Sequence, residues 1–340
     1  MTASLIVPCW NCAATLGRCL ACVRAQTHSD FEAIFVDDGS TDATDARLAD
    51  AARADARLRV VTQPHRGVSA ARNAGLAAAR GTYVFFADPD DAFSPDLIAK
   101  GVAAMEADRA DYCVFPYREK EEGAAAFHTV PLKGPCRHFS NAEIVEAHMS
   151  RLFGYSAAHV RAWYAGAPLA AHRLQGGVWR CVYRRALIEA RHVRFDERIE
   201  LYEDALFNCA YMLEAERMTC VAEPLYDYIL SPRGAVARLR GGVRELRNKL
   251  ELLRARKALD AASGGRLGPM YAGSCVFSLL EMLRIVLSGR APLDEGLRLV
   301  DAYGRDPVVR AALRAFPLSA RHPALALAVW TLRARFRVAR

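Results

Sequence analysis

The sequence contains no run of 18 apolar residues, the length that a helix needs to cross a membrane. The nearest stretch, Ala272 to Leu287, is interrupted by Glu281 and Arg284. The first ten residues, MTASLIVPCW, carry no basic segment, and their apolar run is too short for a secretory signal. We therefore expect a cytoplasmic protein that binds, at most peripherally, to the inner face of the membrane.

Glycine-rich phosphate loops are also missing where two classes of α/β protein need them. No Gly-x-Gly-x-x-Gly follows the first predicted strand, which weighs against a dinucleotide-binding domain. That strand ends instead in Pro8-Cys9-Trp10-Asn11, so the early phosphate loop expected of a nucleotidyltransferase is absent as well. A nucleotidyltransferase on a related α/β sheet therefore remains only as an alternative interpretation.

Acidic residues are outnumbered in this chain of 340 residues. The 46 Lys and Arg against 38 Asp and Glu give a formal net charge of +8, which suits polyanions, an anionic membrane or phosphorylated substrates. With 52% hydrophobic and 25% charged residues, the composition is that of a folded globular protein. A basic nucleic-acid-binding protein is thus a second alternative. The acidic turns described below would repel a phosphate backbone unless a metal were bound, so no nucleic acid partner is expected.

Ten cysteines include the pairs Cys9-x-x-Cys12 and Cys19-x-x-Cys22, a spacing that zinc sites use. Cys9 falls at the end of a predicted strand, and Cys19 and Cys22 fall within a predicted helix, whereas structural zinc knuckles usually interrupt a fold with loops. We interpret these cysteines as small buried residues and expect reduced thiols throughout a cytoplasmic chain.

Short apolar strands alternate with helices in the N-terminal part of the chain. Apolar runs predict strands at 4–8, 31–36, 58–61 and 82–86, and helical spacing with capping residues predicts helices at 13–25, 43–54 and 67–79. This alternation predicts an α/β fold with a mostly parallel central sheet flanked by helices. Ligands of such sheets bind at the carboxyl ends of the strands. Pro8, Asp38 and Asp88 lie at or just past strand ends, so they should face one crevice.

Acidic residues crowd the end of the fourth strand, in the segment from Gly81 to Asp96. Asp88, Asp90 and Asp91 lie within four positions, and carboxylates that close repel one another unless a cation or strong donors hold them. One interpretation is a divalent metal with a phosphate group on its far side, because Asp-x-Asp at a strand end can aim two hard oxygen ligands at one ion. The other is an acidic turn that caps the helix opened by Ser94-Pro95-Asp96. The segment alone does not decide between them.

Two later segments also leave both a functional and a structural interpretation open. Glu203-Asp204 begins an amphipathic helix, where paired carboxylates serve either catalysis or the helix N-terminus. Trp179 lies in the aromatic and basic run from Gly177 to Arg185, which opens another predicted helix and whose arginines can simply be solvated.

The C-terminal part, from Val243 onward, is predicted to be helical, with breaks at Gly264-Gly265, Gly289 and Pro307. The final segment, 324–340, separates apolar and basic residues onto two faces. The apolar face holds Leu325, Val329, Leu332 and Phe336, and the basic face holds Arg333, Arg337 and Arg340. Such a helix lies either at a membrane interface or on the surface of a soluble domain.

Four motifs occur in a fixed order: IVPCWN from Ile6, VDDGSTD from Val36, GVSAARNAG from Gly67 and ADPDD from Ala87. Together they closely resemble the family 2 glycosyltransferases, which have the GT-A fold, and the resemblance runs from about Ser4 to Tyr228. It implies an inverting transfer of a sugar from a nucleotide diphosphate donor, usually UDP-linked, to a hydroxyl of a glycan or lipid-linked acceptor in cell-surface polysaccharide synthesis.

The resemblance also implies a domain organisation. A GT-A glycosyltransferase domain is expected over residues 1–232, with a nucleotide-sugar half at 1–110 and an acceptor half at 111–232. A helical C-terminal extension is expected over residues 233–340.

On the donor side, the resemblance assigns roles to residues near the nucleotide base. Pro8 resembles the backbone contact beside the base, and Asp38 resembles the acid that accepts the uracil imide N–H. Asn11 and His65 are the further expected nucleotide-sugar contacts, although His65 stands where an asparagine is more usual.

Nearer the reacting atoms, Arg72 matches the family arginine beside the donor. Asp88 and Asp90 match the Asp-x-Asp that holds Mg²⁺ or Mn²⁺ on the diphosphate. Glu203-Asp204 matches the family's Glu-Asp pair, in which Asp204 resembles the general base. Glu203 and Trp179 are expected on the acceptor side, and the C-terminal helix is a candidate contact for an anionic membrane surface.

Overall fold

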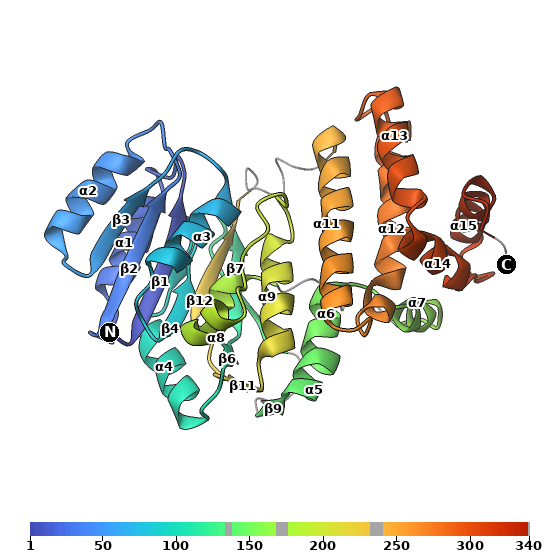
Figure 1. Ribbon diagram of the computed structural model, residues 1–340. Helices are drawn as coiled ribbons and strands as arrows, with labels where there is room; N and C mark the ends of the chain where they lie inside the picture. Colours follow the sequence, from blue (N-terminus) through green and yellow to red (C-terminus); the bar gives the residue numbers. More distant parts are fainter. Residues whose placement is uncertain (133–137, 168–175, 232–240, 339–340) are drawn as a thin grey trace. The chain divides into compact units, whose positions relative to one another are not determined.

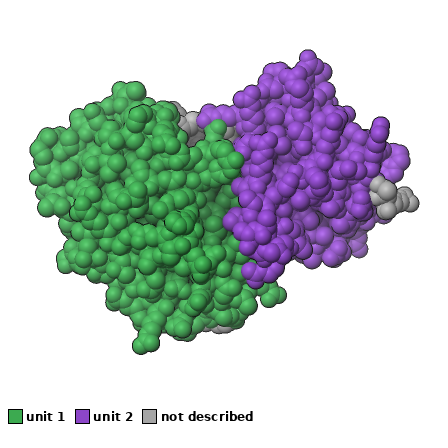
Figure 2. Space-filling model, in the orientation of Figure 1, with its two compact units in different colours: residues 1–146, 177–234 green, residues 147–176, 235–340 purple. Residues whose placement is uncertain are grey.

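The computed structural model describes residues 1–132, 138–167, 176–231 and 241–338. The chain folds into two compact units (Figure 2): the first comprises residues 1–146 and 177–234, and the second comprises residues 147–176 and 235–340. The segment 147–176, which the sequence analysis assigned to the acceptor half, is grouped with the C-terminal helices. The division into functional domains at residue 232 stays a prediction.

The first unit begins with the predicted alternation of strands and helices (Figure 1). Its elements are β1 (Ala3–Cys9), α1 (Leu16–Arg24), β2 (Phe31–Asp37), α2 (Thr44–Ala54), β3 (Leu58–Thr62), α3 (Val68–Ala78) and β4 (Tyr83–Phe86). Every residue of β1, β2 and β4 is buried, as continuous apolar runs require of central parallel strands. All of these predicted elements are confirmed, with ends shifted by a few residues.

The main sheet has the strand order β3-β2-β1-β4-β10-β6-β11-β9. Its later strands are β6 (Tyr112–Val114), β9 (Phe139–Ser140), β10 (Cys181–Arg184) and β11 (Arg217–Cys220). The four strands β3, β2, β1 and β4 run parallel to one another, and β10 runs antiparallel to both β4 and β6. The mostly parallel sheet is therefore confirmed, and the carboxyl ends of β1, β2 and β4 lie at one edge.

A smaller sheet brings a distant strand beside the acidic turn. It has the order β5-β12-β7-β8, formed by β5 (Ala92–Phe93), β12 (Tyr226–Leu230), β7 (Tyr117–Glu121) and β8 (His128–Val130). β12 pairs antiparallel with β5, and β5 begins directly after Asp91. Residues from the end of the first unit thus meet the turn that follows β4.

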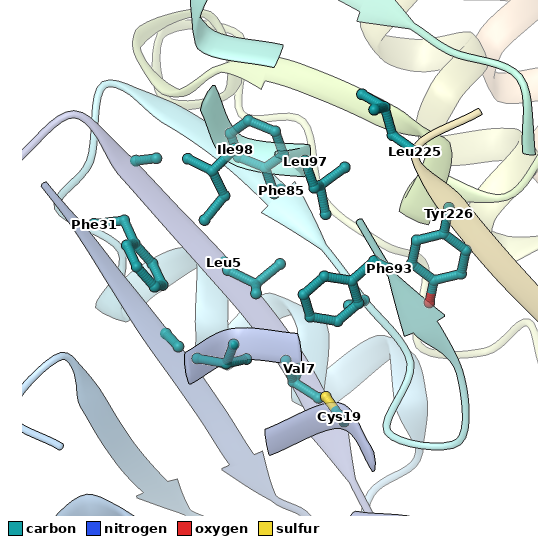
Figure 3. Packing of buried hydrophobic residues seen from close by; sticks show 14 of the residues in the cluster. Leu5, Val7, Cys19, Phe31, Phe85, Phe93, Leu97, Ile98, Leu225 and Tyr226 are labelled. Atoms are coloured by element: carbon teal, nitrogen blue, oxygen red, sulfur yellow. The ribbon is translucent and has the colours of Figure 1, made fainter. Parts of the chain in front are cut away.

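Helices flank these sheets and complete the core of the first unit. They are α4 (Leu97–Ala107), α5 (Asn141–Glu143), the short 3₁₀-helix η3 (Val178–Arg180), α8 (Arg185–Ala190) and α9 (Glu203–Glu214). Figure 3 shows Leu5 and Phe85 of neighbouring strands packed beside Leu97 and Ile98 of α4, within one buried cluster that also includes Tyr226. Burying each large side chain of this kind contributes about 1.5–3 kcal/mol. This packed core therefore holds the ends of the strands in fixed positions.

Helix α3 lies unusually close to β1. A Cβ atom at Gly75 would be 2.3 Å from Cγ2 of Ile6, so a larger residue would push the helix off the sheet. Arg72, three residues earlier on the same helix, is buried as a result of this packing. A glycine in the GVSAARNAG motif thus places an arginine at the edge where the strands end.

The second unit is helical. Its helices are η1 (Ile144–Met149, a π-helix shared with the first unit), α6 (Ser150–Phe153), α7 (Ala157–Tyr164), α11 (Val243–Ala262), α12 (Gly268–Leu287), α13 (Leu293–Gly304), α14 (Pro307–Ala315) and α15 (Pro323–Arg335). Gly264 and Gly265 follow α11 with φ of 71° and 80°, and Gly289 follows α12 with φ of 73°. The predicted breaks and the helical C-terminal region are confirmed.

Helix α12 is the only helix in the described ranges that is long and apolar enough to span a membrane, with a mean hydropathy of 1.5. The sequence analysis expected no such segment, so this helix is an exception to it. Half of the apolar window is buried, and Tyr271, Cys275, Leu279 and Met282 pack inside the second unit. The central helix of a folded unit has these same properties, so length and composition are weak grounds for a membrane span.

The apolar face predicted for the last helix is not a membrane face. Val329, Leu332 and Phe336 are buried in the second unit. The guanidinium of Arg333 donates hydrogen bonds to the backbone carbonyls of Leu313 and Phe316, at 2.8 Å each. For these residues the packing agrees with the second alternative, a helix of a soluble domain, and Arg340 lies outside the described residues.

The cysteines are mostly as expected. Cys9, Cys12 and Cys19 are buried free thiols, which agrees with their interpretation as core residues. Cys220, at the end of β11, is disulfide-bonded, so the expectation of reduced thiols throughout the chain is wrong at this position.

Candidate active site

The acidic turn after β4 is held in place by its third aspartate. Asp91 is buried; its Oδ1 accepts the backbone N–H of Ile229 at 2.8 Å, and its Oδ2 accepts the hydroxyl of Tyr226 at 3.0 Å. Burial, followed by repulsion from Asp88, raises the pKa of Asp91 well above its usual range. Asp91 therefore fastens the turn to β12 and is not oriented toward a ligand.

Tyr226 links both ends of this turn. Its hydroxyl donates to Asp91 and also accepts the backbone N–H of Asp88 at 2.9 Å. Its ring lies parallel to that of Phe93, with centroids 6.1 Å apart, in the core shown in Figure 3. One buried hydroxyl thus fixes where Asp88 leaves the strand and where the turn ends.

Asp90 lies between these anchored positions, and its carboxylate is only partly exposed. Burial raises the pKa of Asp90 to about 6, and repulsion from Asp88 contributes in the same direction. The guanidinium of Arg18 donates to the backbone carbonyls of Asp90 and Asp91, which holds the backbone and leaves the Asp90 carboxylate available. A bound cation would relieve the repulsion between Asp88 and Asp90.

Arg72 is the centre of the charged cluster. Its Nη2 lies 3.1 Å from Oδ1 of Asp88, and its Nη1 lies 2.9 Å from Oε1 of Glu203. The guanidinium is buried, and it packs over the ring of Phe195 at 5.4 Å from the centroid. One buried cation therefore joins the turn after β4 to the beginning of α9, which is more than a hundred residues away in the sequence.

The two carboxylates at the start of α9 have different surroundings. Glu203 is buried and pairs with Arg72; burial raises its pKa, and Arg72 opposes that rise. Asp204 is partly exposed, and its Oδ1 accepts the backbone N–H of Ala205 at 2.7 Å. Burial, followed by repulsion from Glu203, raises the pKa of Asp204 to about 7. A carboxylate with a pKa near neutrality can exchange a proton at physiological pH.

At the ends of β2 and β3, Asp38 organises a loop. Its carboxylate accepts hydrogen bonds from Gln63 Nε2 at 2.6 Å and from the backbone N–H groups of Arg66 and Gly67 at 2.9 and 2.7 Å. Nδ1 of His65 lies 2.8 Å from its second oxygen. A base that paired with Asp38 would have to replace one of these donors.

The other residues expected beside the nucleotide base lie in the same region. Trp10 and His65 stack with ring centroids 4.4 Å apart, and both side chains are substantially exposed. Asn11 adopts a left-handed conformation with φ of 49°, and its Oδ1 accepts the backbone N–H of Thr41 at 2.8 Å. Pro8 is buried within β1. Asn11 and Asp38 therefore shape the loops, while Trp10 and His65 present rings to solvent.

Trp179 reaches the acidic turn through an aromatic stack. Its ring lies parallel to that of Tyr226 at 4.6 Å and to that of Tyr228 at 5.2 Å, and it meets Tyr117 edge-on. Since Tyr226 also contacts Asp88 and Asp91, Trp179 is one side chain removed from the carboxylates.

The carboxylates of the turn suit a metal ion that takes only some of its ligands from the protein. The described residues contain no group of three or more His, Cys, Asp or Glu side chains arranged to bind an ion. Asp91 is committed to Tyr226 and Ile229, so Asp88 and Asp90 are the two carboxylates that remain. Mg²⁺ typically binds through one or two carboxylates with substrate phosphates and water, and this arrangement fits that pattern.

Some residues that hold this site together carry no signal in the sequence. Tyr226 and Arg18 belong to no recognised motif, and their role depends on pairing that only the folded chain reveals. Asp91 was noticed as a third acid, but nothing in the sequence distinguished its buried, hydrogen-bonded position from those of Asp88 and Asp90.

Comparison with known proteins finds similarity to one family of enzymes. Residues 4–159 match the family model of Glycosyl transferase family 2. The chain is 34% identical to EpsJ of Bacillus subtilis (strain 168), named an uncharacterised glycosyltransferase, over 67% of this chain and 61% of that protein. It is 29% identical to the succinoglycan biosynthesis protein ExoO of Rhizobium meliloti (strain 1021), over 69% of this chain and 62% of that one. The chain thus spans somewhat less than two thirds of the length of these relatives.

Solved structures establish the fold. TarS 1–349 of S. aureus, in complex with UDP, aligns with a TM-score of 0.63 and 18% identity over 99% of this chain and 88% of that one. The mannosyltransferase PcManGT of Pyrobaculum calidifontis, in complex with GDP-Man and Mn²⁺, aligns with a TM-score of 0.51 and 15% identity. The alignment covers 99% of this chain and 83% of that one. The chain therefore has the GT-A fold, and its residues 4–159 carry the sequence pattern of the family 2 glycosyltransferases.

Proposed function

We propose that this protein transfers a sugar, with inversion, from a UDP-linked donor to a hydroxyl group of a glycan or lipid-linked acceptor during synthesis of a cell-surface polysaccharide. The observation that carries the proposal is the bridge made by Arg72. It holds Asp88, from the motif expected to face the donor diphosphate, next to Glu203, whose neighbour Asp204 is expected to face the acceptor. Donor and acceptor groups therefore share one buried electrostatic site.

On the donor side, Asp88 and Asp90 are the proposed ligands of Mg²⁺ or Mn²⁺. PcManGT was solved with GDP-Man and Mn²⁺, which supports a metal-dependent donor site in this fold. When bound, the metal would neutralise the negative charge that develops on the departing diphosphate. Arg72 pairs with Oδ1 of Asp88, so Oδ2 of Asp88 and the carboxylate of Asp90 are the oxygens proposed to coordinate it.

For the nucleotide, the rings of Trp10 and His65 and the carboxylate of Asp38 form the proposed base site. His65 is the exposed donor on Asp38, with half of its side chain accessible, so it is the one proposed to give way to the uracil imide N–H. Asn11 and Pro8 shape the adjoining loop and strand. The complex of TarS with UDP supports the choice of UDP.

On the acceptor side, Asp204 is the proposed general base. Its pKa of about 7 suits a group that must be ionised to accept a proton from the acceptor hydroxyl. Glu203 is occupied by Arg72, which makes it a positioning residue. A single base is sufficient for direct displacement with inversion, in which the acceptor oxygen bonds to the anomeric carbon as the diphosphate leaves.

The partly exposed ring of Trp179, which lies parallel to those of Tyr226 and Tyr228, belongs to an aromatic stack near the carboxylates. Sugar rings have apolar faces that pack on aromatic side chains, so this stack is the proposed acceptor platform. The name of ExoO, a succinoglycan biosynthesis protein, supports a polysaccharide as the product. A cytoplasmic site of action follows from the use of nucleotide sugars.

The first prediction separates the roles of the two carboxylates on α9. Asp204→Asn keeps the shape of the side chain but cannot take a proton, so sugar transfer should fall on the order of a hundredfold or more with nearly normal UDP affinity. Glu203→Gln should retain more activity. In the wild type, kcat/KM should rise with pH up to about 7, where Asp204 ionises, and level off above it.

These values would come from transfer assays across pH and from calorimetry with UDP. Normal turnover of Asp204→Asn combined with an inactive Glu203→Gln would reverse the roles. Activity in both variants would place the base elsewhere.

A second prediction concerns the metal. Titrating UDP- and GDP-linked sugars by calorimetry, with and without Mn²⁺, should reveal Mn²⁺-dependent binding of a UDP-sugar. Asp90→Ala should abolish the metal dependence, because Asp88 alone provides too few oxygens. Asp96→Ala, which changes an acid outside the turn, is the matched control. If Asp90→Ala folds and keeps its full metal dependence, Asp90 is not a ligand.

A third prediction tests Tyr226 as a positioning residue. Tyr226→Phe keeps the aromatic stack but leaves the Asp91 carboxylate and the Asp88 N–H without their partner, which should cost about 1–3 kcal/mol of unfolding free energy. The Mn²⁺ concentration for half-maximal transfer should rise about tenfold as the turn loosens. Tyr228→Phe, which also keeps its stack on Trp179, should change neither quantity. A stability loss with an unchanged Mn²⁺ requirement would make Tyr226 purely structural.

A further inference from the structure

The last helix carries a second apolar face that the second unit does not use. Leu327 is 64% exposed and Trp330 is 55% exposed, while Leu318, in the segment just before α15, is 43% exposed. Residues three apart on a helix share a face, so Leu327 and Trp330 point the same way. With Pro323 and Ala326 they line a shallow groove of about 470 Å³. We call these residues the outer α15 face.

This face is distinct from the one that holds the helix in place. Val329, Leu332 and Phe336 are buried, so α15 is anchored without any contribution from Leu327 or Trp330. Large exposed apolar side chains that gather on one surface mark an interaction site more often than chance exposure does. The outer α15 face is therefore free to serve a partner.

The surface is also rigidly presented. Tyr164, at the end of α7, donates from its hydroxyl to the carbonyl of Pro317 at 3.2 Å, and its own carbonyl accepts from Arg321 at 3.1 Å. His322, which precedes α15, stacks on Trp163 with ring centroids 4.4 Å apart. These contacts fix the start of the helix, so little ordering would be needed on binding.

The charge of this region favours an anionic partner. Residues 307–340 contain no acidic residue but seven arginines: Arg310, Arg314, Arg321, Arg333, Arg335, Arg337 and Arg340. The preceding 306 residues hold 39 basic and 38 acidic side chains, so nearly all of the net charge of +8 lies in this last tenth of the chain. Arg314 and Arg337 are exposed, and Asp301 neutralises only Arg335 and Arg305.

We infer that the outer α15 face binds the surface of an anionic lipid bilayer, with Leu327 and Trp330 inserted among the headgroups and the exposed Arg314 and Arg337 drawn to lipid phosphates. Tryptophan favours the boundary between headgroups and acyl chains, and arginine carries its charge to the water side of such a boundary. This inference does not depend on which sugar is transferred. It replaces, as the membrane contact, the face on which Val329, Leu332 and Phe336 are buried.

The test compares vesicles of phosphatidylcholine alone with vesicles that also contain phosphatidylglycerol, using the full-length protein. The wild type should sediment with the anionic vesicles only, and high salt should weaken binding. Leu327→Ser/Trp330→Ser should reduce the partition coefficient at least about tenfold. The matched control Leu287→Ser/Leu293→Ser removes two exposed leucines elsewhere in the second unit, 76% and 57% accessible, and should bind normally.

Two further variants test the electrostatic part and the depth of insertion. Arg314→Gln and Arg337→Gln should each weaken binding to anionic vesicles about fivefold. The emission of Trp330, obtained by difference from Trp330→Phe, should shift to shorter wavelength when vesicles are added. Circular dichroism melting would confirm that each variant is folded.

Equal sedimentation of the wild type and the folded Leu327→Ser/Trp330→Ser variant would overturn the inference. So would a wild type that ignores anionic vesicles but self-associates through the outer α15 face, since that result would assign the face to a second copy of the chain.

Discussion

The structure depends on a buried cation. Burying the guanidinium of Arg72 away from water costs free energy. The carboxylates of Asp88 and Glu203, from distant parts of the chain, offset this cost by pairing with it. Neither carboxylate is well placed without the arginine, because burial already raises the pKa of Glu203 and repulsion acts between the acids of the turn. The three groups therefore determine one another's positions, and the proposed chemistry is built around them.

The fold makes this arrangement possible through close packing. Parallel strands bring the ends of β1, β2 and β4 to one edge, and the absence of a side chain at Gly75 lets α3 approach β1 closely enough to bury Arg72. The smaller sheet then brings β12 against the acidic turn, so that Tyr226 can bond to both Asp88 and Asp91. One carboxylate in each acidic motif is committed to structure, namely Asp91 in the turn and Glu203 on α9. Their neighbours Asp90 and Asp204 are the residues proposed to take part in the chemistry.

Much of the fold was predictable from the sequence because it depends on local patterns. Apolar runs and capping residues located the first seven elements, and their alternation implied a parallel sheet. The motifs also pointed to Arg72, Asp88 and Glu203, which the structure brings together. What could not be predicted depends on tertiary contacts: the hydroxyl of Tyr226 and the guanidinium of Arg18 act on a turn far away in the sequence. The two alternatives for the last helix stayed open for a related reason, since α15 is apolar on two faces and periodicity alone cannot tell which one meets the core.

A double-mutant cycle in unfolding free energy tests the central claim, that Arg72 and Glu203 act as a coupled buried pair. The cycle comprises Arg72→Gln, Glu203→Gln and the double variant, each unfolded in urea. We expect the double variant to lose at least about 1 kcal/mol less than the two single losses combined, because each single change leaves a buried charge unpaired. Losses that add to within about 0.5 kcal/mol would show that the two residues act independently and would contradict the account.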